Sequence, residues 1–428
     1  MGSSGAVSFI RNPSRFLFDI FILLIDLLSI FLFRPVLPMK WTTAVSQNSH
    51  ATLAFREACA QLELPKGAAA DVLLVFFSDH HVDNARDLAL AMTSDFPNAV
   101  AVGCNAEGVV GSADIGEAQP SLSVMVGHLP GVKVRPMRFE AERHDHHDFD
   151  WRGELQVADG DTPHFLILSQ AEGFETEGLL TALDRAFPSA QLFGALTEAS
   201  ATTGTCLILE GHVYRSGAVG LAFSGNVRVD TVVAQTCRPI GQPLIVTEHT
   251  QNIIHQFNSG NPMEVFQRLV ADLDPDDRKL AQHAMFVGIG VENKTGVYRP
   301  GDFVLRNLIG FNPKTGDLAI AAPIRDLDII QFHLMDPQSI GTEFNRAMGN
   351  FAAKLDADAM PNGALLFSGI SSAENRSDKA LEESDILRDH FGCTPLGGFF
   401  SEGEIAPVGR TPCVHGFAST VVFFRSRF

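Results

Sequence analysis

The feature that most constrains this chain is an internal repeat with an offset of 91 residues. The offset needs no gap and carries Gly103 to Gly194 and Glu107 to Glu198. In each copy an apolar run is followed by a polar turn, a helix-like segment and a second apolar run that ends near the glycine. We therefore expect a strand–helix–strand unit in each copy.

The helix-like segments carry apolar residues at positions i, i+4 and i+8, which share one face of a helix. These residues are Leu88, Met92 and Phe96 in the first copy and Leu179, Leu183 and Phe187 in the second. A proline follows each segment, at Pro97 and Pro188, and predicts the end of each helix.

A third, looser copy lies near the C-terminus, where an offset of 295 carries Gly103 to Gly398 and Glu107 to Glu402. Its opening strand reads "ALLFSG" and its second strand ends in "PLGGFFSEGE". Another strand-like run follows each copy, as in "GAVGLAFSG" and "GFASTVVFF". The predicted fold is α/β, with mixed sheets and flanking helices built from pseudo-repeated strand–helix–strand units.

The repeat places acidic residues at equivalent positions. Glu107, Glu198 and Glu402 each lie four residues after a glycine that ends a predicted buried strand. Loops that follow strand ends are common ligand sites in α/β proteins, but a carboxylate there can also accept backbone N–H bonds within the turn. Both roles stay open. Glu404 lies two residues after Glu402, so on an extended strand the two carboxylates would share one face and could line one pocket.

The charge balance bears on the class of partner. The chain carries 50 acidic and 32 basic residues, a formal charge of −18, and no cluster of Lys and Arg that could follow a phosphate backbone. Nucleic acid is therefore not expected as a partner.

The six cysteines include no C-x-x-C pair, which fits neither a disulfide framework nor a zinc ribbon. We expect buried, inert thiols and a cytoplasmic location.

The segment 16–33, "FLFDIFILLIDLLSIFLF", is nearly long enough for a membrane span but is interrupted by Asp19 and Asp26. Three interpretations stay open for residues 1–38: a working chain that starts at Met39, a membrane tether, or a packed helix. A membrane is expected as a partner only if this extension is retained.

Three segments resemble those of a known family, the FIST domain proteins. They are "AVAVGCNAEGVVGS" (99–112), "SGAVGLAFSGNVRVDTVVAQTCRPIGQP" and its continuation to Phe266, and "PLGGFFSEGEIAP" (395–407), in the family's order. The resemblance begins near Asp71. With the hydrophobic extension over 1–38 set apart, it implies a FIST N-terminal domain over 39–258 and a FIST C-terminal domain over 259–428.

The resemblance also implies a function. FIST proteins are sensory modules for small ligands, which suggests an amino acid or a related metabolite and signalling through a separate partner protein. The chain departs from the family at two positions: Ser368 replaces a common cysteine, and Thr236 stands where glycine is usual.

The predicted ligand site combines opposite charges. Glu402 and Glu404 would meet a cationic group, and Arg238 in the turn "CRPIGQP" would form two parallel bonds with a carboxylate. The remaining candidates are Phe399, Asn252, Glu107 and Glu198. No cofactor, metal or catalytic residue is expected at this site.

Two other functions stay open. One is an enzyme acting on a small metabolite, metal-assisted through His80 and His81, because imidazole is a common ligand of zinc and iron. A second histidine cluster, "HDHHD" (144–148), is interpreted as a solvated loop, and Cys104 as a packed thiol rather than a nucleophile. The other function is a scaffold that binds no ligand, in which the glutamate turns are purely structural.

Overall fold

The computed structural model describes residues 38–111, 115–117, 119–140, 149–155, 157, 162–197, 203–291, 298, 301–336, 340–356, 359–369 and 376–427. The described residues from Met39 onward belong to one compact unit. The hydrophobic segment 16–33 and the histidine cluster 144–148 lie outside the described residues. Across the described ranges, no helix has both the length and the apolar character that a membrane crossing requires.

Two mixed sheets and a small barrel make up the unit Met39–Phe428, which confirms the predicted α/β class. The first sheet has six strands in the order β1 (Lys40–Ser46), β6 (Leu122–His128), β2 (Val72–Ser78), β3 (Val100–Ala106), β10 (Leu207–Leu209) and β11 (His212–Tyr214). Helices α2 (Ala51–Ala60) and α3 (Ala85–Asp95) pack on it, and a 3-10 turn, η1 (Asp79–Asn84), precedes α3.

The second sheet has eleven strands. Its main path runs β13 (Arg228–Gln235), β23 (Ala418–Arg425), β20 (Gly363–Gly369), β21 (Leu396–Val408), β9 (Leu192–Thr197), β8 (His164–Gln170), β12 (Ala218–Gly225) and β7 (Val132–Phe139). Strands β22 (Thr411–His415), β4 (Gly108–Gly111) and β5 (Ile115–Glu117) join it off this path. Its helices are α4 (Trp151–Glu154), α5 (Thr176–Ala186), α8 (Ile340–Ala352) and α9 (Arg376–Phe391).

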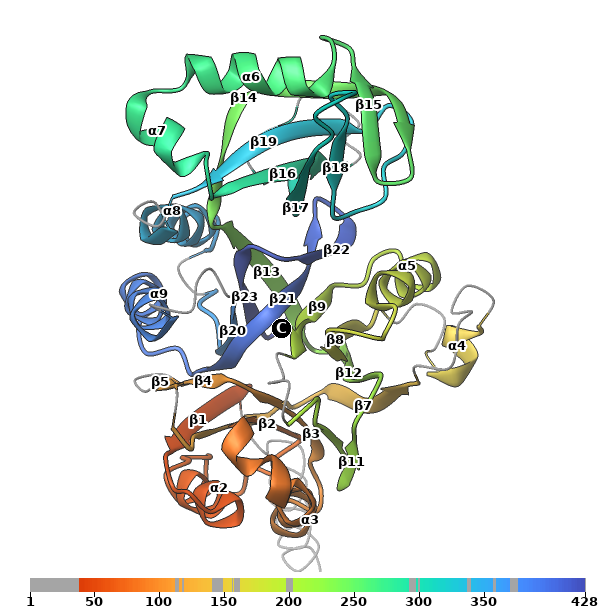
Figure 1. Ribbon diagram of the computed structural model, residues 1–428. Helices are drawn as coiled ribbons and strands as arrows, with labels where there is room; N and C mark the ends of the chain where they lie inside the picture. Colours follow the sequence, from red (N-terminus) through yellow and green to blue (C-terminus); the bar gives the residue numbers. More distant parts are fainter. Residues whose placement is uncertain are drawn as a thin grey trace, which may run out of the picture. The chain divides into compact units, whose positions relative to one another are not determined.

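A closed barrel is inserted between β13 and α8 (Figure 1). Its strands, in order, are β14 (Cys237–Thr250), β15 (Ile253–Phe257), β18 (Leu318–Ile320), β17 (Phe303–Phe311), β16 (Met285–Gly290) and β19 (Ile329–Met335). Helices α6 (Pro262–Asp272) and α7 (Pro275–Leu280) both begin with a side-chain cap, from Asn261 and Asp274, and a proline at the first position. The domain boundary predicted between 258 and 259 falls between β15 and α6, and it stays a prediction.

Three segments of the chain share one order of strand pairing. In each, a parallel pair is joined by a helix, as β2–α3–β3, β8–α5–β9 and β20–α9–β21. The first strand of each pair then pairs antiparallel with a later strand, β6, β12 or β23. The origin of these units as a sequence repeat stays a prediction.

The core forms in layers. A large apolar cluster lies between the two sheets and includes Phe76 of the first sheet and Phe367 and Phe399 of the second. Smaller clusters lie under the helices on the other faces, with α2 and α3 on the first sheet and α5 and α9 on the second. Strands buried on both faces explain the continuous apolar runs in the sequence.

The predicted helix faces are buried. Leu88, Met92, Leu179 and Leu183 have no exposed area, Phe187 is 3% exposed and Phe96 is half-buried. Both helices end before the proline, at Asp95 and Ala186. The two prolines therefore act as the sequence predicts.

Two of the repeat glycines are required by the backbone. Gly194 has a φ of 145° and Gly398 a φ of 153°, and a Cβ on either would lie 1.9 Å from a carbonyl oxygen of the neighbouring parallel strand, that of Ile167 or Leu366. Only glycine fits this conformation and this approach.

Candidate functional site

The strand β21 carries both glutamates of the predicted pair, but on opposite faces. Glu402 is exposed, whereas Glu404 has no exposed area. The cause is a β-bulge in the pairing with β9, between Ser401 and Gly403, which adds a residue and breaks the alternation of side chains. The prediction of one shared face is therefore wrong, and so is the placement of these residues in a turn, because β21 continues to Val408.

Glu402 opens onto a pocket of about 620 Å³. Most of the other lining residues come from α5, the barrel strand β17 and the hairpin strand β22 with the turn after it (Figure 1), and Ala321 follows the barrel strand β18. They are Glu177, Leu305, Arg306, Asn307, Ala321, Val414, His415, Gly416 and Phe417. Parts of the chain that are far apart in sequence thus build one site.

Arg306 is the cation of this pocket. Its Nη1 donates to the carbonyl oxygens of Leu305 at 2.9 Å and Val414 at 3.1 Å, and its Nη2 donates to Glu177 Oε1 at 2.6 Å. A guanidinium has five N–H donors, so the Nε–H and one Nη2–H are not engaged by any described residue. Arginine therefore remains available to a ligand carboxylate.

The acidic side of the pocket consists of Glu402 and Glu177. Partial burial raises the pKa of Glu402, and the charge of Glu172 raises it further. A carboxylate whose charge is poorly solvated gains from a cation placed beside it, because the cation replaces the missing water. A cation beside Glu402 would therefore favour its charged form and oppose the rise of its pKa.

Two of the lining residues, His415 and Phe417, add no charge to the pocket. His415 is buried and its Nε2 lies 3.2 Å from the carbonyl oxygen of Ala406, and burial lowers its pKa to about 4. Phe417 contacts Phe286 with ring centroids 4.3 Å apart. At neutral pH the charges of this site therefore come from Glu177, Glu402 and Arg306.

Glu404, on the opposite face, belongs to a closed polar cluster. Its Oε1 accepts a hydrogen bond from Ser401 Oγ at 2.7 Å, and Oε2 has no partner among the described residues. Burial raises the pKa of Glu404 to about 8, although Ser401 and Lys379 oppose the shift. The carboxyl is therefore mostly protonated at neutral pH.

Ser368, at the position where the family commonly has cysteine, joins the same cluster. Its Oγ donates to Glu383 Oε2 at 2.8 Å, and Ser419 Oγ donates to Oε1 of the same glutamate. Lys379 Nζ lies 3.6 Å from Glu383 Oε1 and donates to Gly369 O at 2.7 Å. Serine thus provides a hydrogen bond to a buried carboxylate that a thiol would form only weakly.

Three of the predicted ligand residues have structural contacts away from the pocket. Arg238 forms ion pairs with Asp277 and with Asp336, the latter at 3.8 Å. Asn252 donates to Ile320 O at 2.9 Å within the barrel. Phe399 has no exposed area, and its ring lies 5.0 Å from that of Phe76 and 5.2 Å from that of Phe367.

Of the two remaining glutamates, Glu107 does not line the pocket. Glu107 is half-buried at a bend between β3 and β4, and Glu198 lies outside the described residues. Of the six predicted residues that the structure describes, Glu402 alone lines the pocket, and Glu404 is on the opposite face of the same strand. Arg306 was missed, and the available signal was a charged residue interrupting the apolar run "FVLRNLIGF".

The metal and nucleophile alternatives find no geometric support. His81 is buried and burial lowers its pKa to about 4, whereas its neighbour His80 is exposed. In the part of the chain that the structure covers, no group of three or more His, Cys, Asp or Glu side chains is arranged to hold a metal ion. Burial raises the pKa of Cys104 well above its usual value, which disfavours the reactive thiolate.

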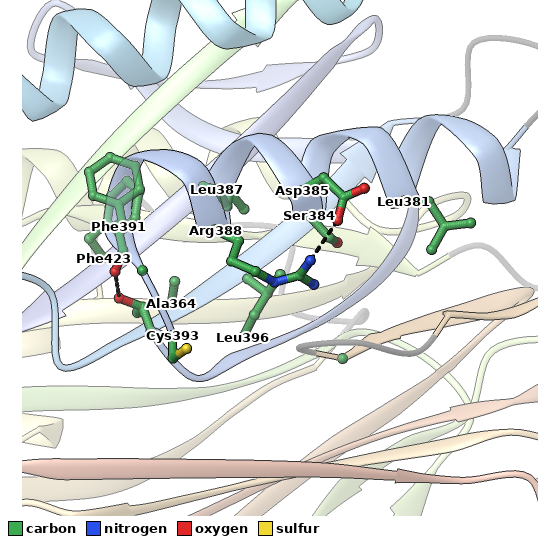
Figure 2. A pocket seen from close by; sticks show the side chains of 13 residues that line it. Ala364, Leu381, Ser384, Asp385, Leu387, Arg388, Phe391, Cys393, Leu396 and Phe423 are labelled. Carbon is green, nitrogen blue, oxygen red and sulfur yellow. Dashed lines mark hydrogen bonds and ion pairs between the residues drawn. The ribbon is translucent and has the colours of Figure 1, made fainter.

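A second pocket, of about 510 Å³, lies along α9 (Figure 2). It is mostly apolar, and at its edge Arg388 pairs with Asp385 at 2.7 Å. Cys393 lines it and is exposed in the turn after α9, next to Gly392 (φ 63°), and Cys59 and Cys413 are half-buried. The prediction of six buried thiols is therefore wrong for these three cysteines. None of the predicted site residues with a described position lines this pocket.

Comparison with known proteins agrees with the resemblance seen in the sequence. The family model of the FIST N domain matches residues 71–259, and that of the FIST C domain matches residues 262–407. An uncharacterized protein of Mycobacterium tuberculosis is 28% identical over 403 residues, which cover 90% of this chain and all of the relative. An uncharacterized protein of Mycobacterium bovis is 27% identical over 359 residues, covering 84% of this chain and 91% of the relative.

Proposed function

Because the chain belongs to the FIST family, whose domains are associated with sensory signalling and small-ligand binding, we propose that it senses an amino acid or a closely related zwitterion. The observation that carries the proposal is that Arg306 and Glu402 line one pocket. A zwitterion presents a carboxylate and an ammonium, and these two side chains offer the complementary charges.

The position and size of the pocket support a small ligand. Glu177 lies in the FIST N match, whereas Arg306 and Glu402 lie in the FIST C match, and ligand sites form preferentially where domains meet. Its volume of about 620 Å³ falls within the usual range of about 300–1,000 Å³ for ligand pockets.

The pocket also offers a route for a signal. Arg306 is on the barrel strand β17, and Glu402 is on β21 of the large sheet. A ligand held by both residues would favour conformations in which the barrel approaches the sheet, because binding shifts the population toward the state that binds best. A separate partner protein would then recognise that conformation.

A thermal-shift screen of the full chain against the common L-amino acids tests the proposal. A ligand at one hundred times its dissociation constant should add about 2.7 kcal/mol to the free energy of unfolding. We expect selective stabilisation that Glu402→Gln abolishes and that Glu248→Gln, an exposed change on β14 outside the pocket, leaves intact. A flat response to every amino acid would overturn the proposal and favour a scaffold role.

A further inference from the structure

A third pocket shares no lining residue with the pocket of Glu402, and three of its lining residues are arginines. It has a volume of about 580 Å³ and is lined by His164, Gln191, Arg228, Val229, Asp230, Asp356, Ala359, Arg425, Ser426 and Arg427. The formal charge of the whole chain is −18, whereas this pocket is lined by three arginines and two aspartates.

A buried hydrogen-bond donor in this pocket has no partner. His164 is 6% exposed, and its Nδ1 accepts a hydrogen bond from the backbone N–H of Gln191 at 3.1 Å. Burial, followed by the charge of Arg427, lowers the pKa of His164 to about 4, so the ring is neutral and its proton is on Nε2. Nε2 has no hydrogen-bond partner among the described residues.

The arginines differ in how far they are already engaged. Arg425 is buried and both its Nε and Nη2 donate to Asp230 Oδ2, while Arg228 Nε lies 3.4 Å from Asp230 Oδ1. Arg427 forms no ion pair with any residue whose placement is described, and its backbone N–H is fixed by Asn226 Oδ1 at 2.9 Å. Asp230 thus holds the guanidinium groups of Arg425 and Arg228 in place, whereas the guanidinium of Arg427 can pair with an anionic ligand.

We propose that this pocket binds the phosphate group of a small phosphorylated metabolite. The argument is that Arg228, Arg425 and Arg427 line one pocket together with His164, whose buried Nε2–H has no partner among the described residues. A phosphate monoester has three terminal oxygens and a charge near −2, so it can accept from more donors than the two oxygens of a carboxylate. The exposed Asp356 at the rim lies where a ligand hydroxyl could donate to it.

Titration calorimetry of the full chain with inorganic phosphate at low ionic strength tests this site. Arg427→Gln removes an exposed charge and should weaken phosphate binding at least tenfold. Arg410→Gln removes the same charge from the exposed turn after β21, outside the pocket, and should leave binding unchanged. His164→Asn keeps an acceptor for the Gln191 N–H, but its shorter side chain places no donor at the position of Nε2, so this variant should also weaken binding.

The outcomes separate the proposal from simpler ones. Equal phosphate affinity in the wild type, Arg427→Gln and Arg410→Gln would overturn the proposal. An absence of binding at 10 mM phosphate would also overturn it, because a dissociation constant on the order of 10 mM is the weakest that such charge-assisted contacts should give. Sodium acetate at matched ionic strength should bind measurably more weakly, and equal binding of acetate would contradict a phosphate site. Binding only to vesicles containing phosphatidic acid, without binding of inorganic phosphate, would assign the surface to lipid instead.

Discussion

Glu402 and Glu404 are separated by one residue, yet the first is exposed in a pocket and the second is completely buried. The β-bulge beside Ser401 causes this separation. One short segment of β21 therefore lies in two different environments. Glu402 lies in a charged pocket that is open to solvent, and Glu404 lies in a buried cluster where its carboxyl stays mostly protonated at neutral pH.

The buried carboxyl predicts a pH dependence of stability. In the unfolded chain Glu404 should release its proton near pH 4.5, whereas in the folded protein it does so near pH 8. Between these values the folded protein holds the extra proton, so the free energy of unfolding contributed by this group falls as pH rises, by about 1.4 kcal/mol per unit. Glu404→Gln mimics the protonated form and should remove this slope.

Urea unfolding at pH 5, 6.5 and 8 measures the effect. The difference in the free energy of unfolding between the wild type and Glu404→Gln should change steadily with pH. The free energy of unfolding of Glu248→Gln should change with pH in the same way as that of the wild type. Parallel profiles for all three proteins would show that Glu404 ionises normally.

Arg306 should determine the affinity for the carboxylate of the ligand. Arg306→Lys keeps the charge but loses the fork and the bonds to Leu305 O and Val414 O. We expect amino acid affinity to fall by about 10- to 100-fold, because charge-assisted bonds contribute about 1.5–3 kcal/mol each. Calorimetry with the matching amino acid amide, which lacks the carboxylate, should show little difference between the two proteins, and an equal loss for both ligands would contradict this role.

Arg238 should matter for stability and not for binding. It is 33% exposed and pairs with Asp277 and Asp336 at the barrel, outside the pocket. Arg238→Gln should lower the free energy of unfolding by at most about 1 kcal/mol, as expected for a partly exposed ion pair. Ligand affinity should match that of the wild type, and a tenfold loss would restore Arg238 as a ligand residue.

Phe399 should behave as a core residue. Its ring is fully buried between those of Phe76 and Phe367, so Phe399→Ala should cost about 3–5 kcal/mol of stability. Phe399→Leu retains more of the buried volume and should cost less. Chemical unfolding measures both, and a loss of ligand affinity with unchanged stability would contradict the assignment.

The sequence predicted the regular elements well because their patterns are local. The apolar faces of α3 and α5, the prolines after them and the glycines at 194 and 398 each follow from a few neighbouring residues. The mixed α/β class follows from the alternation of such elements.

The site was harder to predict because its geometry depends on pairing between distant strands. The bulge that turns Glu402 away from Glu404 arises from the register between β21 and β9, which the alternation rule cannot reveal. Arg306 reaches the pocket from the barrel, and Arg238 meets Asp277 and Asp336 from remote parts of the chain. The role of each arginine therefore depends on the residues around it in the folded chain: Arg306 lines the pocket, and Arg238 forms ion pairs.

The most direct test of the central claim is calorimetric titration of the full chain and its Glu402→Gln variant with the amino acid that gives the largest thermal shift. The account predicts one binding site in the wild type, at least a tenfold loss of affinity in Glu402→Gln, and melting temperatures within about 2 °C of each other, because an exposed substitution changes stability little. Equal affinity in the two proteins would place the ligand elsewhere and contradict the account.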